Sequence, residues 1–74
     1  MILTPRLCRA ARAGLNWTQG DLAKRAVVST STVNDFEREV SKPHATTLEE
    51  LRRVLTEAGV DFVSEHTLTF AERA

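Results

Sequence analysis

Residues 17–37, WTQGDLAKRAVVSTSTVNDFE, carry the pattern that decides the fold. Apolar residues recur at helical spacing on both sides of a short break, so two helices are expected here. Thr18 and Ser29 stand at N-cap positions. Each follows a bulky apolar residue that can pack against an apolar residue in the first turn of the helix. Only about three residues, 26–28, link the helices, which forces them to cross steeply. The stretch therefore predicts a tight pair of crossed helices.

Two further helices are expected, one on each side of this pair. Thr4 followed by Pro5 predicts the start of the first, because proline is favoured at the first helical position. Thr46 and Glu49 have the spacing of a capping box, which predicts the start of the last. The four expected helices span about residues 5–13, 18–25, 29–38 and 47–58. Their spacing points the following side chains inward: Leu7, Ala10, Ala11, Leu22, Ala23, Ala26, Val33, Phe36, Leu48, Leu51, Val54 and Leu55.

Length and composition indicate one small domain. A chain of 74 residues buries only about 60% of its unfolded surface, so a partner subunit would add stability. No apolar run is long enough for a membrane span or a secretory signal, and we expect no membrane partner and a cytoplasmic location. The single cysteine, Cys8, fits a reducing compartment, and we expect it to act as a small buried apolar residue.

The charge pattern is mixed. The formal net charge is +0, which counts against a nucleic-acid binder, since such proteins are usually basic. Yet the five cations in residues 1–28 (Arg6, Arg9, Arg12, Lys24 and Arg25) are opposed there only by Asp21. A basic face can therefore exist on a neutral molecule.

The helix expected at about 29–38 has an unusual polar face. Short hydrogen-bonding side chains cover it in place of the Glu and Lys common on solvated helices. Such a face suits a helix seated in the major groove, where Asn can pair with adenine and Asp can accept from cytosine. The expected base-contacting residues are Thr30, Ser31, Asn34 and Asp35.

The sequence also resembles a known family, the Cro/C1-type or XRE helix-turn-helix regulators. The similarity covers residues 3 to about 59 and is carried by RAAR at 9–12, WTQGDLAKRA at 17–26, VSTSTVNDFE at 28–37 and TLEELRRVL at 47–55. It implies a mainly α, lambda-repressor-like domain of four or five helices, which we place over residues 1–59, with residues 60–74 as a separate tail. It also implies a homodimer that binds double-stranded DNA at an inverted-repeat operator, and repression or autoregulation of transcription.

The resemblance implies roles for particular residues. Thr18 and Gln19 begin the second helix and should meet a DNA phosphate, in agreement with the positive end of a helix dipole. An ion pair between Arg12 and Glu37 should tie the first helix to the end of the third. The full set of expected phosphate contacts is Thr18, Gln19, Ser29, Arg38 and Lys42.

Two residues depart from the family pattern. Val27 stands at the turn position that is usually a glycine with positive φ, where a β-branched residue is strained by about 1–2 kcal/mol. Either the turn is reshaped or Val27 gains packing in return. Glu39 replaces another frequent glycine, and an acid there opposes both the helix dipole and a nearby phosphate.

The last fifteen residues change period. Val60, Phe62, Leu68 and Phe70 all carry even numbers, which predicts a strand with one apolar face. Residues 65–67 are a possible turn, so either one strand or a hairpin is expected. Because the four helices already close a core, we expect these four residues to form the dimer interface.

Other functions find less support. The sequence has no nucleophile paired with a base, no Gly-rich phosphate loop and no ligand spacing around His44 or His66, so we expect no enzyme, cofactor or metal. The remaining alternative is a protein-interaction module with weak DNA affinity, such as an antitoxin-like or antiactivator-binding protein. Net neutrality and Glu39 favour that alternative, which includes a regulatory protein partner.

Overall fold

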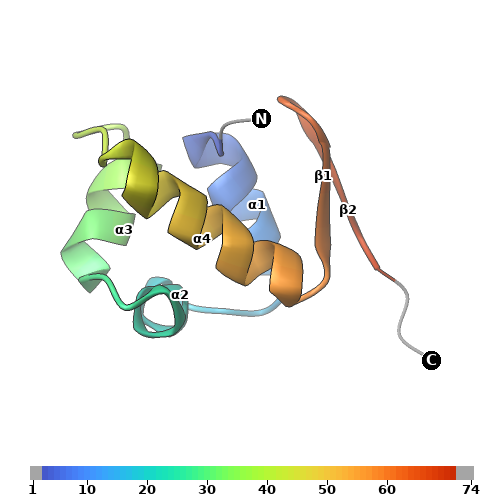
Figure 1. Ribbon diagram of the computed structural model, residues 1–74, viewed down its shortest axis with the longest axis horizontal. Helices are drawn as coiled ribbons and strands as arrows, with labels where there is room; N and C mark the ends of the chain where they lie inside the picture. Colours follow the sequence, from blue (N-terminus) through green and yellow to red (C-terminus); the bar gives the residue numbers. More distant parts are fainter. Residues whose placement is uncertain (1–2, 72–74) are drawn as a thin grey trace.

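Four helices and a hairpin follow one another in a computed structural model that describes residues 3–71 (Figure 1). The helices are α1 (Pro5–Gly14), α2 (Gln19–Ala26), α3 (Thr30–Glu37) and α4 (Ala45–Glu57). The strands β1 (Val60–Ser64) and β2 (Thr67–Phe70) pair antiparallel. The hairpin stands beside α1 and α4, at the opposite side of the molecule from α3 (Figure 1). The predicted mainly α fold with a short β tail is confirmed.

Side chains cap the first three helices at the predicted positions. The hydroxyl oxygens of Thr4, Thr18 and Ser29 each accept a hydrogen bond from a backbone N–H three residues later. Each cap satisfies one of the N–H groups that a helix start leaves without a partner. Local sequence therefore determines where these helices begin.

The start of α4 differs from the prediction. This helix begins at Ala45, and its N-cap residue His44 makes no side-chain cap bond. The N–H of Leu48 donates to the carbonyl of His44 at 3.1 Å, so the first helical turn begins before Thr46. Thr46 consequently lies inside the helix, and the predicted capping box with Glu49 is wrong.

One core joins the four helices and the hairpin. Its buried apolar members are Leu3, Leu7, Cys8, Ala11, Leu22, Ala23, Ala26, Val33, Phe36, Leu48, Leu51, Val54, Leu55, Val60 and Phe62. Ala10 was expected among them but is exposed. The buried stripe of α1 runs through Leu7, Cys8 and Ala11, and Ala10 projects roughly 100° from the middle of that stripe.

The tail is a hairpin, which decides between the two forms that the sequence left open. Val60 pairs with Phe70 and Phe62 with Leu68, so the even-numbered residues share one face. The register shifts between Phe62 and Ser64, where Val63 is the extra residue of a bulge. Val63 is 59% exposed and lies outside the buried face formed by Val60 and Phe62.

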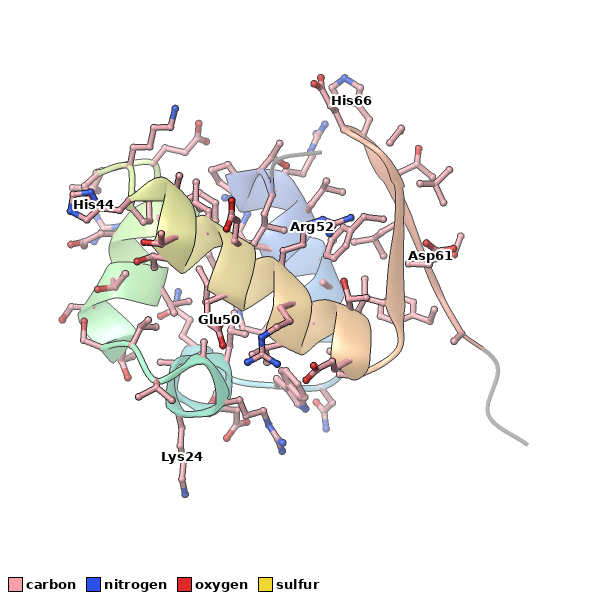
Figure 2. The ribbon with its side chains drawn as sticks, in the orientation of Figure 1. Lys24, His44, Glu50, Arg52, Asp61 and His66 are labelled. Carbon is pink, nitrogen blue, oxygen red and sulfur yellow. The ribbon has the colours of Figure 1, made fainter. Side chains whose placement is uncertain are left out.

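The apolar face of the hairpin packs on its own helices. Val60 and Phe62 are buried, and the guanidinium carbon of Arg52 lies 5.6 Å from the ring centroid of Phe62. Figure 2 shows Arg52 on α4 reaching toward β1, with Asp61 on the other side of the strand. The expectation that all four apolar residues form a dimer interface is therefore corrected, because these two belong to the core of the chain. Leu68 is partly buried, and Phe70 is 43% exposed.

Candidate nucleic-acid interface

A tight turn joins α2 to α3. Val27 has φ 57° and ψ 47°, and its N–H donates to the carbonyl of Lys24 at 3.3 Å. The N–H of Val28 donates to the carbonyl of Ala23 at 2.9 Å, which completes a Schellman motif. This motif needs a left-handed residue at position 27, so the turn keeps the geometry of the usual glycine. Val27 gains no packing either, since its side chain is 88% exposed, and both sequence expectations for it fail.

The polar residues of α3 face outward together. Thr30 and Ser31 are exposed, and Asn34 and Asp35 are partly exposed. The opposite side of the helix buries Val33 and Phe36 in the core, together with Glu37. These anchors fix the rotation of α3, so the four predicted base-contacting side chains lie on one outward face.

The first turn of α2 adjoins the first turn of α3. A Cβ built on Gly20 would lie 3.6 Å from Oγ1 of Thr18 and 3.9 Å from Oγ1 of Thr30. The two helix N-termini therefore form one continuous surface. In a helix-turn-helix bound to DNA, the first helix crosses the backbone while the N-terminal residues of the second meet base edges.

A carboxylate already occupies the N-terminus of α2. The backbone N–H of Thr18 donates to Oδ2 of Asp21 at 2.9 Å, and the N–H of Asp21 donates to Oγ1 of Thr18 at 3.0 Å. The hydrogen bond from the Thr18 backbone lowers the pKa of Asp21. The resulting charge stands where the sequence predicted a phosphate. Sequence reasoning missed this capping box, although the spacing T-x-x-D was there to suggest it.

Glu37 is the centre of a network that joins the first three helices. Its carboxylate accepts two bonds from Arg12, from Nε to Oε2 and from Nη2 to Oε1, both at 2.9 Å. Nε2 of Gln19 donates to Oε1 at 3.1 Å, and Sγ of Cys8 donates to Oε2 at 3.3 Å. Arg9 donates to the backbone carbonyl of Glu37. The expected Arg12–Glu37 ion pair is thus present, and the amide nitrogen of Gln19 is engaged with it.

The network keeps Glu37 charged although only 2% of the residue is exposed. Burial raises the pKa of this carboxyl, but hydrogen bonds from Arg12, Gln19 and Cys8 outweigh that effect, and the pKa lies below its ordinary value. Burial and then the Glu37 charge raise the pKa of the Cys8 thiol far above its ordinary range. Cys8 is therefore a buried neutral donor, and its part in the network had no signal in the sequence.

The other expected phosphate contacts lie at the two ends of α3. Ser29 uses its hydroxyl to cap the helix and also lies 2.8 Å from Oγ1 of Thr32. Arg38 caps the C-terminus and is exposed, as is Lys42 in the following loop. Glu39 lies between them with φ 60°, so cations and an acid alternate at this end of the helix. Their contacts with DNA stay a prediction.

Comparison with known families agrees with this geometry. The sequence profile of a helix-turn-helix family matches residues 9–57, which include α2, α3, their turn and all of α4. The chain belongs to the Cro/C1-type (XRE) helix-turn-helix family. Proteins of this family are DNA-binding regulators. A search among curated proteins found no match to the chain.

Within residues 3–71, no helix combines the length and the apolar character needed to cross a bilayer. The same residues contain no group of three or more His, Cys, Asp and Glu side chains that could hold a metal ion. His44 at the start of α4 and His66 in the hairpin turn are well separated (Figure 2).

Proposed function

We propose that this helix-turn-helix protein is a sequence-specific transcriptional regulator that binds an inverted-repeat DNA operator as a homodimer. The outward polar face of α3, held rigidly by the Glu37 network and the core, is the observation that carries the proposal. Short donors and acceptors on a fixed helix can meet base edges without losing much side-chain entropy. Bound in this way, a cytoplasmic repressor would block access to a promoter.

The residues divide into two roles on DNA. Thr30, Ser31, Asn34 and Asp35 read bases, while the free N–H groups at the start of α2 and the side chains of Arg38 and Lys42 approach phosphates. The two N–H groups of Gln19 and Gly20 make no hydrogen bond within residues 3–71. They are therefore available to a phosphate, even though the neighbouring Asp21 reduces the attraction.

The hairpin supports the homodimer through a free strand edge. The N–H of Ala71 donates to the carbonyl of Gly59 at 2.7 Å, so these two residues form a hydrogen-bonded pair of the antiparallel ladder. Because hydrogen-bonded pairs alternate along an antiparallel ladder, the backbone groups of Leu68 and Phe70 point away from β1. A second copy related by a two-fold axis can pair with them and extend the sheet to four strands.

Sedimentation equilibrium at micromolar concentration tests this dimer. We expect a wild-type dimer, a monomer for Phe70→Lys and a dimer for the control Val63→Lys. Both residues are exposed apolar residues of the hairpin, but only Phe70 lies on the free edge of β2. A monomeric wild type, or a Phe70→Lys variant that dimerises normally, would contradict the proposed interface.

Selection of bound fragments from the source genome tests DNA binding itself. We expect enriched fragments to share an inverted repeat with half-site centres about 10 bp, or roughly 34 Å, apart. Phosphate contacts should make the affinity fall steeply as salt rises. If no fragment binds better than random DNA at low salt, the proposal fails.

A protein-interaction module is the second candidate, and one observation favours it. The Asp21 carboxylate at the start of α2 and the exposed Glu39 after α3 place negative charge at both ends of the candidate interface. Such an interface repels phosphates and would suit a regulatory protein partner with a basic surface. Absence of preferential DNA binding in the fragment selection would favour this candidate.

A further inference from the structure

We propose that the side chain of Val27 makes an apolar contact to DNA beside the outward polar face of α3. This inference rests on the proposed DNA-binding function. It assigns a task to a valine side chain that is strained and exposed without compensation from the described residues 3–71.

Val27 combines two unfavourable features. It has φ 57°, a conformation in which a β-branched side chain is a clear outlier, and it is 88% exposed. The Schellman bonds from the N–H groups of Val27 and Val28 explain why the backbone adopts this conformation. They do not explain the valine, since glycine would make the same main-chain bonds without strain.

Nothing in the described part of the chain compensates for this strain. The partly buried apolar residues packed on the core include Val28, Trp17, Leu15 and Leu68, but not Val27. Asn16 and Glu39 also have positive φ, but neither is β-branched. A strained residue whose strain is not offset by packing within its own fold is a candidate for function.

The position of Val27 indicates what it can touch. It lies in the connection between α2 and α3, two residues before the N-cap Ser29 (Figure 1). In a helix-turn-helix, the N-terminal end of the second helix, here α3, meets base edges in the major groove. The residues just before α3 therefore lie close to the sugar-phosphate edge of that groove. An uncharged branched side chain gains nothing from a phosphate, whereas deoxyribose carbons and the 5-methyl group of thymine offer apolar contact.

Two variants of the 74-residue chain test this contact on an operator found by selection. Val27→Thr keeps the branched shape and its backbone strain but replaces one methyl by a hydroxyl. We expect about five-fold weaker operator binding, in proportion to a partial loss of apolar burial. Val27→Gly removes the whole side chain and should bind more weakly still, while unfolding at higher urea concentration than the wild type, because the strain is removed.

Replacing thymine by deoxyuridine in the operator distinguishes the two apolar groups of DNA. If Val27 touches a thymine methyl, one such replacement weakens the wild type but has no further effect on Val27→Thr. If it touches deoxyribose, both proteins tolerate every replacement equally, while Val27→Thr stays weaker than the wild type. Val63→Thr, an equivalent change of an exposed valine in the hairpin, should bind like the wild type.

The outcomes separate this inference from the proposed function. A wild type without preference for any DNA overturns both. A wild type that binds its operator specifically, together with a Val27→Thr variant of equal affinity, overturns the Val27 contact alone.

Discussion

Replacing Arg12 by alanine should destabilise the fold by about 3–5 kcal/mol, the usual loss when one partner of a buried ion pair is removed. The reason lies in the environment of Glu37, of which only 2% is exposed. The change removes both 2.9 Å bonds to the carboxylate and leaves it with the neutral donors Gln19 and Cys8. It also removes the 2.9 Å bond from Nη1 of Arg12 to the carbonyl of Trp17.

This loss is large for so small a protein. At about 0.05–0.15 kcal/mol per residue, the total free energy of unfolding is about 4–11 kcal/mol. Urea unfolding followed by circular dichroism can measure the difference, and an unfolded variant would count as the upper extreme of the predicted loss.

Arg53→Ala is the matched control for this measurement. Arg53 pairs with Glu50 and with Glu57 at 2.7 Å, but the side chain is 51% exposed and water screens both pairs. We expect a much smaller loss of stability for this variant. If Arg12→Ala lost no more stability than Arg53→Ala, the reasoning about the buried pair would be wrong.

The dependence on pH gives an independent check. In the wild type, the pKa of Glu37 lies below its ordinary value, so its stabilisation is present above the unfolded-state pKa and is lost as pH falls through the folded-state pKa. In Arg12→Ala, burial without a charged partner should raise this pKa, and the variant should gain stability as pH falls. The gap in stability between the two proteins should therefore narrow toward acid pH.

Four further substitutions should have measurable effects. Gly14→Ala should move the hairpin and weaken dimerisation in sedimentation, because a Cβ at Gly14 would lie 1.9 Å from Cζ of Phe70; unchanged dimerisation would show that the ring simply rotates away. Asp21→Ala should lower the melting temperature but raise affinity for all DNA in a binding titration, since it removes both a cap and a negative charge; equal affinity would place the start of α2 away from phosphates. Asp35→Ala should relax base preference in a selection experiment, whereas Lys42→Ala should weaken all sequences alike and reduce the salt slope by about one; the reverse pattern would exchange their assigned roles.

Local interactions explain which parts of the fold were predictable. Thr4, Thr18 and Ser29 cap their helices through bonds that span three residues, so short patterns were sufficient to locate them. The positive φ at Val27 was expected only from the family pattern, in which a glycine occupies this turn, while the short link predicted the steep crossing of α2 and α3. The wrong prediction of a helix start at Thr46 shows the limit of such patterns, because the helix begins two residues earlier, with His44 as its N-cap residue.

The sequence by itself determined the helices, most of the core and the polar face of α3, because these depend on periodicity within single elements. The Arg12–Glu37 pair was expected from the family resemblance. Only the tertiary structure showed that Cys8 and Gln19 join this pair, since contacts across 29 and 18 residues leave no local pattern. The same holds for the hairpin, whose alternation predicted an apolar face but not what covers it. The hairpin packs on its own chain because α1 and α4 leave an apolar surface that covers Val60 and Phe62. Burial there costs less free energy than burial against a second subunit, because no association entropy is lost.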